Sequence, residues 1–254
     1  MITMKGAAVS AKLKEQVEKG LETLTWVPKL TIIRVGENPD DISYEKGATK
    51  KLTSFGLEVE SKVFPGDISD EAFKKEFAAI NADASVDGIL MLRPLPKQIN
   101  EQDIEKMIDP AKDLDGISPV NIAKVFSGDT SGFAPCTAEA VVCMLKMNDI
   151  AISGKRVAVV GRSMVVGRPL SMLLLHENAT VTICHSRTAS LPEVCREADI
   201  LTACVGKAAM INHTYVKKDA VVIDVGINVD ENGKLCGDVD FADLEGTASA
   251  ATPV

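Results

Sequence analysis

The sequence lacks any apolar run of about 18 residues, the length that a membrane-spanning helix requires. Residues 1–20 also lack the apolar core of a signal peptide. Basic residues are scattered rather than clustered, the net charge is −8 and the pI is about 5.0. Nucleic-acid-binding proteins usually carry a basic patch. These absences predict a cytoplasmic protein that binds neither membranes nor nucleic acids.

Patterns typical of disulfides and metal sites are missing as well. The six cysteines form no C-x-x-C pair, and several lie in apolar runs such as "TVTICHS" and "ILTACVG". We therefore expect buried, reduced thiols. The three histidines, at positions 176, 185 and 213, do not have the spacing of metal ligands, so we predict no metal site.

What is present is an ordinary globular composition with a regular alternation of helix and strand patterns. Hydrophobic residues make up 46% of the 254 residues and charged residues 25%, and this length suits two α/β domains. "AVSAKLKEQVEKGLETL" has helical spacing and "PKLTIIRVG" reads as a strand. Gly56 is expected to end the next helix and Ser69 to cap the one after it. This alternation predicts α/β domains with parallel strands.

A second helix–strand series follows residue 138. "RVAVVG", "VGRPLSMLLLHE" and "ATVTICHS" read as strand, helix and strand, the pattern of a mononucleotide-binding unit. Residues 120–137 are rich in Ser, Gly, Pro and Thr, which suits a connection. We therefore predict an N-terminal α/β domain at 1–122 and a Rossmann-type parallel sheet at 123–254, with a cleft between them.

The loop "GRSMVVGRP" after "RVAVV" is the candidate phosphate site. Gly161 and Gly167 do not form G-x-G-x-x-G, so the standard dinucleotide fingerprint is absent. The loop still ends a strand and opens a helix, with Pro169 acceptable in the first turn. Unpaired N–H groups and the helix dipole would then face a phosphate. A strand-to-helix turn with two glycines also occurs in α/β proteins that bind no nucleotide.

The end of the next strand favours NADP over NAD. An NAD site usually has a carboxylate there that binds the ribose hydroxyls. This sequence has "HSRT" from His185 to Thr188, with hydroxyls and Arg187 but no acid, and Arg162 adds a second guanidinium. A guanidinium suits a 2′-phosphate. The alternative is that both arginines are solvated surface charges.

With these residues identified, the chain resembles the bifunctional methylenetetrahydrofolate dehydrogenase/cyclohydrolase family, the FolD family. The resemblance runs along the whole chain and is carried by "VGENPDDISY", "DGILMLRPLP", "DPAKDLDGISPVN", "GFAPCT", "VVGRSMVVGRP", "TVTICHSRT", "ADILTACVG", "VIDVGIN", "GDVDF" and "TPV". It implies folate in the N-terminal domain, NADP in the C-terminal one, and a homodimer. The implied reaction is hydride transfer from 5,10-methylenetetrahydrofolate to NADP, commonly followed by hydrolysis to 10-formyltetrahydrofolate.

The resemblance also implies roles for individual residues. Tyr44 matches the active-site tyrosine beside the pterin and p-aminobenzoyl groups. Asp115, the second acid of "DLDG", matches the aspartate that binds the pterin, since a carboxylate can accept two N–H bonds. These two residues are the catalytic candidates. Thr137 matches a position at the domain junction, where substrate and nicotinamide meet.

The cofactor contacts implied by the resemblance lie in the C-terminal domain. Arg162, Ser163 and Ser186 match residues that bind the cofactor. Arg162 and Ser186 would hold the 2′-phosphate, with Arg187 beside them.

Two departures from the family coincide. Family members carry Y-x-x-x-K, but Ala48 follows Tyr44 at the lysine position, and the spacing to Gly56 leaves no room for a gap. The strand that usually reads "VQLPLP" reads "MLRPLP", with Leu92 at the position of the glutamine that pairs with the lysine. Losing both partners of a polar pair suggests a coordinated change of site chemistry.

The two half-reactions depend differently on that pair. Hydride transfer mainly requires two rings held face to face, because the folate nitrogens stabilise the product cation. Hydrolysis requires an activated water and proton transfer. We therefore expect dehydrogenase activity with weak or lost cyclohydrolase activity. One alternative is that the base has moved to another residue, for which Lys51 lies near the same helix face. Another is a catalytically silent binding protein. Arg93 is no candidate base, because it should project opposite Leu92 and arginine stays protonated.

Two further differences concern the junction and the end of the chain. "CTAEA" lacks the proline that usually follows the residue matching Thr137. Family members continue past "TPV" with a glycine-rich loop and a helix that returns to the first domain. Since the sequence stops at Val254, the expectation is that this return helix is absent, which leaves the site incomplete if Val254 is the true end.

Overall fold

The computed structural model describes residues 1–253, so the expectation attached to Val254 lies outside the described residues. It divides the chain into two compact units. The N-terminal unit is Ala11–Ala134, and the C-terminal unit combines Met1–Ser10 with Pro135–Val254. No helix in the described part of the chain is long and apolar enough to cross a membrane.

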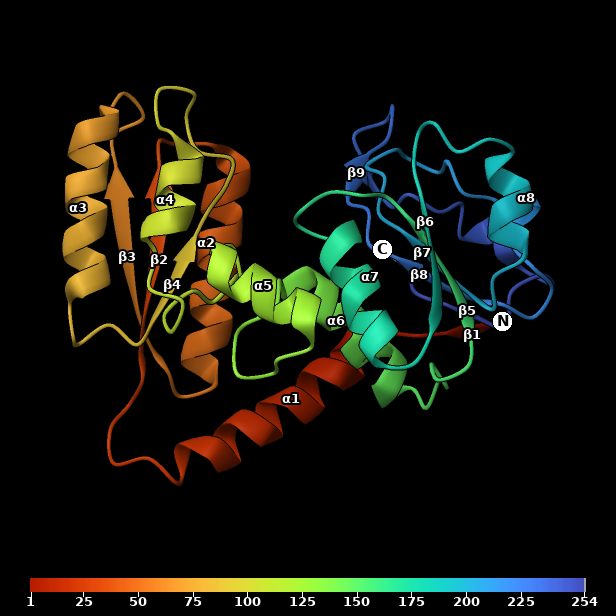
Figure 1. Cartoon of the computed structure of the whole chain (residues 1–254), viewed down its shortest axis with the longest axis horizontal. Helices are drawn as coiled ribbons and strands as arrows, with labels where there is room; N and C mark the ends of the chain where they lie inside the picture. Colours follow the sequence, from red (N-terminus) through yellow and green to blue (C-terminus); the bar gives the residue numbers. More distant parts are fainter. Residues whose placement is uncertain (254) are drawn as a thin grey trace. The chain divides into compact units, whose positions relative to one another are not determined.

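The N-terminal unit contains a three-stranded parallel sheet in the order β3-β2-β4. Its elements are α1 (Gly6–Leu21, whose first residues belong to the other unit), β2 (Lys29–Val35), α2 (Pro39–Ser54), β3 (Glu58–Phe64), α3 (Asp70–Ala82), β4 (Gly88–Met91), α4 (Glu101–Met107) and α5 (Pro119–Ser127). Figure 1 shows α2 and α3 on opposite sides of this sheet. The parallel pairing confirms the prediction from the helix–strand alternation.

Helix α2 ends and helix α3 begins at the residues that the sequence predicts. The Ser69 hydroxyl accepts a hydrogen bond from the N–H of Ala72 and caps α3. Gly56 follows α2 with a φ of +92°, a conformation that glycine adopts without the steric cost of a side chain. These two residues therefore place α2 and α3 correctly from sequence alone.

Successive side chains of β2 point to opposite faces of the N-terminal sheet. Ile33 packs in one apolar cluster with Phe73 and Phe77 of α3. Arg34, the next residue, points to the opposite face, where it pairs with Glu45 of α2. The apolar core of this unit thus lies on the α3 side of the sheet, and the α2 side carries a buried charge pair.

The C-terminal unit contains a six-stranded, all-parallel sheet in the order β1-β11-β8-β7-β5-β6. Its elements are β1 (Ile2–Thr3), α6 (Cys136–Met147), β5 (Arg156–Val160), α7 (Gly167–His176), β6 (Thr180–Cys184), α8 (Leu191–Arg196), β7 (Ile200–Ala203), η1 (His213–Tyr215), β8 (Val221–Asp224), β9 (Asn228–Val229), β10 (Leu235–Cys236), η2 (Ala242–Leu244) and β11 (Ala250–Ala251). The antiparallel β9–β10 pair forms a separate hairpin.

Both faces of this larger sheet are covered. Val157 and Val159 pack in one cluster with residues of α6 and α7, whereas Ala158 and Val160 pack in the other with residues of α8. Figure 1 shows the strands between α6 and α7 on one side and α8 on the other. Burial on both faces explains why β5 reads as a continuous apolar run rather than an alternating one.

The division of the chain differs from the predicted boundary at 122/123. Residues 120–137 were expected to form a connection, but Pro119–Ser127 form helix α5, which belongs to the N-terminal unit. Ser118 caps this helix and Gly128 ends it in the left-handed region. The boundary along the chain therefore lies between Ala134 and Pro135. Residues 1–10 belong to the C-terminal unit because β1 pairs with β11.

Candidate functional site

The carboxyl ends of β5 and β6 bring two predicted cofactor loops together. Val160 at the end of β5 pairs with Cys184 at the end of β6, while β7 lies on the other side of β5. Connections that leave β5 and its neighbour in opposite directions open a crevice at this edge in doubly wound sheets. The loop from Gly161 to Gly167 and the loop that begins at His185 both start here.

The first loop requires both of its glycines. Gly161 has a φ of +139°, and a Cβ there would lie 2.3 Å from the carbonyl oxygen of Cys204. A Cβ on Gly167 would lie 2.2 Å from the carbonyl oxygen of Gly161. The loop is therefore closed on itself and against the end of β7, although its spacing is not G-x-G-x-x-G.

Ser163 caps the helix that follows this loop. Its hydroxyl accepts hydrogen bonds from the N–H groups of Val166 at 3.1 Å and Gly167 at 3.4 Å, and its carbonyl accepts one from Arg168. The expectation that amides at the start of α7 are unpaired is thus corrected for these three. They already have an acceptor within the loop, because a serine four residues before the helix folds back over its first turn.

The charged and hydroxyl side chains expected at the 2′-phosphate are exposed at the same sheet edge. After β6 the chain makes a tight turn in which the N–H of His185 donates to Thr188 Oγ1 at 2.8 Å and Thr188 N–H donates back to the His185 carbonyl. Ser186 and Arg187 lie exposed within this turn, and Arg162 is exposed at the end of β5. No carboxylate occupies residues 185–190.

Thr137 lies exposed in the first turn of α6, within the C-terminal unit. The next residue, Ala138, is buried against the sheet together with Val141 and Leu145. These apolar contacts anchor the helix on one face and leave Thr137 on another, as expected for an amphipathic helix.

Two carboxylates that the sequence analysis did not single out, one buried and one half-buried, shape the neighbouring loops. Asp238 is fully buried and accepts hydrogen bonds from the N–H groups of Val205, Gly206 and Lys207, which follow β7. Burial raises the pKa of Asp224, at the end of β8, even though backbone N–H groups donate to it. The motifs "VIDVGIN" and "GDVDF" contain both acids, but their spacing does not reveal which loops they hold.

The two acids of "DLDG" have different surroundings. Asp113 is fully buried and accepts hydrogen bonds from the N–H groups of Ile117 and Ser118 and from the side-chain amide of Asn121. It holds the turn together. Asp115 is only partly buried, with its carboxylate at the carboxyl edge of the N-terminal sheet. Of the two, Asp115 is the acid that a ligand can reach.

Arg93 lies among acidic side chains at this edge. Its Nη2 donates to Asp115 at 3.4 Å. Its Nη1 contacts Glu101 at 3.4 Å and Glu105 at 3.3 Å, both on α4. Arg93 thus points away from the α2 face, as predicted. Burial raises the pKa of Glu105, which Arg93 lowers only in part. The sequence signal for this cluster was an arginine at the end of an apolar strand.

Tyr44 lies on α2 with 59% of its surface exposed. Ala48 follows one turn later on the same helix and is half-buried. Leu92 is 8% exposed and directly follows β4, whose Met91 is in register with Ile33 of β2. It therefore lies on the same face of the sheet as Arg34, the face that α2 covers.

An ion pair lies on this α2 face. Arg34 Nε donates to Glu45 Oε2 at 2.5 Å, and both side chains are largely buried. The other arm of the guanidinium donates to the carbonyl of Gly36. Burial alone would raise the pKa of Glu45, but hydrogen bonds from Ser61 and Arg34 outweigh it and hold the pKa below its ordinary value.

Lys51, the candidate for a relocated base, points the other way along α2. Its ammonium lies over the ring of Phe55, 5.2 Å from the ring centroid. Phe55 follows Lys51 by one turn, whereas Tyr44 precedes it by about two turns. A cation–π contact at an exposed site contributes about 0.5–1 kcal/mol. This geometry disfavours Lys51 as a replacement for the lysine position at Ala48.

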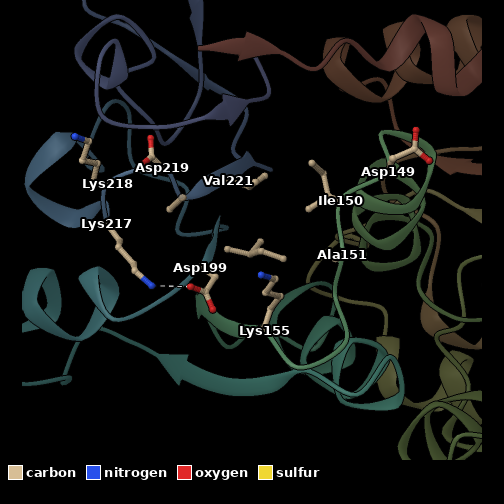
Figure 2. A pocket seen from close by; sticks show the side chains of 11 residues that line it. Asp149, Ile150, Ala151, Lys155, Asp199, Lys217, Lys218, Asp219 and Val221 are labelled. Atoms are coloured by element: carbon tan, nitrogen blue, oxygen red, sulfur yellow. Dashed lines mark hydrogen bonds and ion pairs between the residues drawn. The ribbon is translucent and has the colours of Figure 1, made fainter.

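A cavity of about 420 Å³ lies at the opposite, amino edge of the C-terminal sheet. Figure 2 shows Lys155, Lys217 and Asp199 pointing into it. Asp199 accepts a hydrogen bond from Lys217 at 2.7 Å and another from the N–H of Arg156 at 3.0 Å. Lys217 and this amide are thus already bound by a carboxylate of the chain, and the cavity lies at the edge of the sheet away from the loop at Gly161, so we do not assign it as the cofactor site.

Within residues 1–253, no three His, Cys, Asp or Glu side chains are grouped as a metal site would require. The parallel sheet, the reversal of strand order at β5 and the glycine-dependent loop instead define a two-domain α/β protein of the dinucleotide-binding class.

Comparison with known families agrees with this class and specifies it. Residues 4–115 match the tetrahydrofolate dehydrogenase/cyclohydrolase catalytic domain, and residues 135–254 match the NAD(P)-binding domain of the same family. The chain therefore belongs to the tetrahydrofolate dehydrogenase/cyclohydrolase family.

Relatives and solved structures match along nearly the whole chain. The "bifunctional protein FolD" of Clostridium kluyveri is 48% identical over 256 residues, covering 100% of this chain and 90% of the relative. The FolD structure from Campylobacter jejuni has a TM-score of 0.96 at 35% identity and covers 100% of this chain and 91% of that one. The Trypanosoma brucei FolD structure, a complex with NADP and inhibitor, has a TM-score of 0.90 at 30% identity, with coverage of 100% and 90%.

Proposed function

We propose that the chain is an NADP-dependent methylenetetrahydrofolate dehydrogenase in which cyclohydrolase activity is weak or lost. The observation that carries this proposal is the apolar character of the two positions, Ala48 and Leu92, where the family has its lysine and glutamine. Ala48 follows Tyr44 by one turn of α2. Leu92 lies on the same face of the N-terminal sheet as Arg34, the face that α2 covers.

The C-terminal unit fits NADP. The close contacts at Gly161 and Gly167 leave no room for a side chain at either position, which suits a backbone that lies against a pyrophosphate. Arg162, Ser186 and Arg187 are exposed at neighbouring strand ends without a carboxylate among them. These groups match a 2′-phosphate better than ribose hydroxyls.

The dehydrogenase half-reaction places few demands on acid–base groups. Bound NADP would supply the hydride acceptor. Hydride departs with its electron pair from the carbon between two folate nitrogens, and the positive charge left on the substrate is shared by those nitrogens. The chain must orient the two rings. Tyr44 would pack beside the folate, Asp115 would accept N–H bonds from the pterin, and Thr137 would lie near the nicotinamide.

The cyclohydrolase half-reaction requires a group that accepts a proton from water near neutral pH. Neither Ala48 nor Leu92 can do so. Glu45 is nearby on α2, but its pKa is lowered by the Ser61 and Arg34 hydrogen bonds even against burial, which weakens it as a base. Lys51 is engaged with Phe55. These contacts support loss of the hydrolase rather than relocation of its base.

Two other functions are the alternatives to this proposal, and a specific observation favours the first of them. Full bifunctionality is favoured by the 48% identity to a relative named a bifunctional protein, and it would require an ordered water or a different base. A catalytically silent folate- or nucleotide-binding protein would keep the same loops without turnover. A homodimer in the cytoplasm is part of our proposal, and light scattering of the purified protein over a range of concentrations tests the dimer.

One assay separates these functions. Purified protein receives methylenetetrahydrofolate with NADP, and NADPH and the methenyl product are followed together. The protein then receives methenyltetrahydrofolate alone, and its decay is compared with the uncatalysed rate. We expect NADPH formation and no accelerated decay. Accelerated decay would establish the bifunctional alternative, and absence of NADPH would establish the silent one.

A gain-of-function variant sharpens the assay. The double variant Ala48→Lys with Leu92→Gln restores the family's polar pair, and general acid–base catalysis is typically worth about 100-fold or more. We expect hydrolysis of methenyltetrahydrofolate to rise by about that factor. Lys46→Ala, on the exposed surface of α2, serves as the control and should leave both reactions unchanged.

A further inference from the structure

One guanidinium at the carboxyl edge of the N-terminal sheet serves several carboxylates. Arg93 lies within 3.4 Å of carboxylate oxygens of Glu101, Glu105 and Asp115. Three negative charges against one positive charge leave this cluster net negative.

The cluster is anchored on the side of α4. The second carboxylate oxygen of Glu101 accepts a hydrogen bond from the N–H of Leu95 at 2.9 Å. Arg93 itself has only 16% of its side chain exposed. Its Nε is buried and has no hydrogen-bond partner within residues 1–253. An arginine held this way has little rotational freedom, because its fork is planar and both terminal nitrogens are engaged.

Asp115 is anchored less directly. The preceding turn is held by Asp113, and Leu114 N–H donates to the carbonyl of Ile89, which ties this segment to β4. These bonds fix the backbone of the turn. The Asp115 side chain is 24% exposed, so its carboxylate is accessible in part, and Arg93 Nη2 contacts its Oδ2.

We propose that Arg93 is a positioning residue that orients the Asp115 carboxylate for the pterin of the folate substrate. This inference rests on the proposed function. The negative charges of Glu101 and Glu105 would repel the Asp115 carboxylate. The guanidinium of Arg93 contacts all three carboxylates and offsets this repulsion by attraction. By holding Oδ2, Arg93 sets the plane in which the carboxylate meets the two N–H groups of a pterin.

A positioning role predicts a specific kinetic pattern. Arg93→Leu should raise the KM for methylenetetrahydrofolate about tenfold, which corresponds to about 1.4 kcal/mol. The kcat and the KM for NADP should stay within about twofold, since hydride transfer and the cofactor loops do not use Arg93. Lys75→Leu is the matched control: it removes an exposed positive charge from α3 without touching Arg93 or Asp115, and its KM should stay within about twofold.

A double-mutant cycle shows whether Arg93 acts through Asp115. Arg93→Leu should add nothing to the KM of Asp115→Asn if the arginine works only by orienting that carboxylate. Multiplicative effects, or an equal rise in the KM for NADP, would overturn the proposal. Arg93→Lys, which keeps the charge but loses the fork, should give a smaller rise of the same kind and replaces Arg93→Leu if melting curves show that Arg93→Leu is unfolded.

The two proposals fail in different ways. If the unmodified protein makes no NADPH, the proposed dehydrogenase fails, and the same cycle is measured by calorimetric binding of tetrahydrofolate. In that measurement, an unchanged affinity in Arg93→Leu would overturn the positioning role. If NADPH forms normally and the cycle is multiplicative, only the positioning role fails.

Discussion

The two units build their candidate sites by different means. In the C-terminal unit the site is mostly backbone: Gly161 and Gly167 approach each other, and Ser163 holds the start of α7, all within one short segment. In the N-terminal unit it consists of side chains from separate segments, such as Arg93 with Asp115. A backbone site tolerates little change, whereas a side-chain site can exchange its chemistry while the fold stays. The departures at Ala48 and Leu92 fall in the second kind.

We expect the largest effect from a side chain added to the glycine loop of the C-terminal unit, which tests whether this backbone site tolerates substitution. Gly167→Ala places a Cβ 2.2 Å from the Gly161 carbonyl oxygen, which forces the loop apart. Since overpacking of side chains already costs about 1–3 kcal/mol, we expect at least about 3 kcal/mol less unfolding free energy and loss of NADP binding, measured by urea unfolding and calorimetry.

Gly47→Ala in α2 is the control for this substitution. A Cβ at Gly47 meets nothing within 4 Å, so alanine should stabilise the helix by about 0.5–1 kcal/mol. Equal unfolding free energies for the two variants would show that the C-terminal loop is not the rigid element inferred from its contacts.

The next effect concerns charge at the edge of the backbone site. Arg162→Ala should raise the KM for NADP about 30-fold and leave the KM for NAD unchanged, because only NADP carries the 2′-phosphate and charge-assisted hydrogen bonds contribute about 1.5–3 kcal/mol. Steady-state kinetics with both cofactors measure this.

Arg156→Ala is its matched control, at the amino end of the same strand, where Arg156 pairs with the exposed Glu197. It should change neither KM. If Arg162→Ala raised the KM for NAD and the KM for NADP equally, Arg162 would not be the residue that binds the 2′-phosphate.

The smallest expected effect tests the side-chain site of the N-terminal unit. Glu45→Gln removes the charge that pairs with Arg34, and hydrogen bonds to charged groups contribute about 1.5–3 kcal/mol. We expect a loss of about 1–2 kcal/mol of unfolding free energy at pH 7 after allowing for partial exposure and for the amide's own hydrogen bond.

This stabilisation has a defined pH dependence. Hydrogen bonds from Ser61 and Arg34 hold the folded-state pKa of Glu45 below its ordinary value of 4.5 despite burial. The contribution is therefore present above pH 4.5 and is lost as the pH falls through the folded-state pKa. The difference between protein and variant should therefore shrink in acid unfolding. Glu18→Gln, from the exposed Lys14–Glu18 pair, should change stability by less than about 0.5 kcal/mol; a constant difference for Glu45→Gln at all pH values would contradict the assignment.

Much of the fold could be predicted because its signals are local. The strands β2 and β5, the cap at Ser69 and the glycine at the end of α2 all follow from patterns within a few residues. Helix α5 was missed because the Ser, Gly, Pro and Thr content of residues 120–137 indicated a connection, whereas the helix itself has apolar side chains that include the buried Val125. The capping serine at 118 was itself the overlooked start signal.

The candidate site was predictable to the extent that its residues stand in recognisable segments. Gly161, Arg162 and Ser186 follow strands that pair in register, so their proximity follows from the parallel sheet. Arg93 was set aside because arginine stays protonated and is a poor base. The sequence does not reveal that Glu101, Glu105 and Asp115 converge on it. The carboxylates approach it from α4 and from a turn after that helix, and only packing decides that.

The amino-acid sequence by itself determined the class of fold, the two loops that we propose for the nucleotide and the apolar residues at positions 48 and 92, because glycine geometry, helix caps and residue identity act over short spans. Only the tertiary structure decided that Ile2 and Thr3 complete the C-terminal sheet by pairing with β11, and that Arg34 and Arg93 point to opposite faces with different carboxylate partners. These contacts join residues far apart in the chain, and their formation depends on which face of a sheet each side chain occupies.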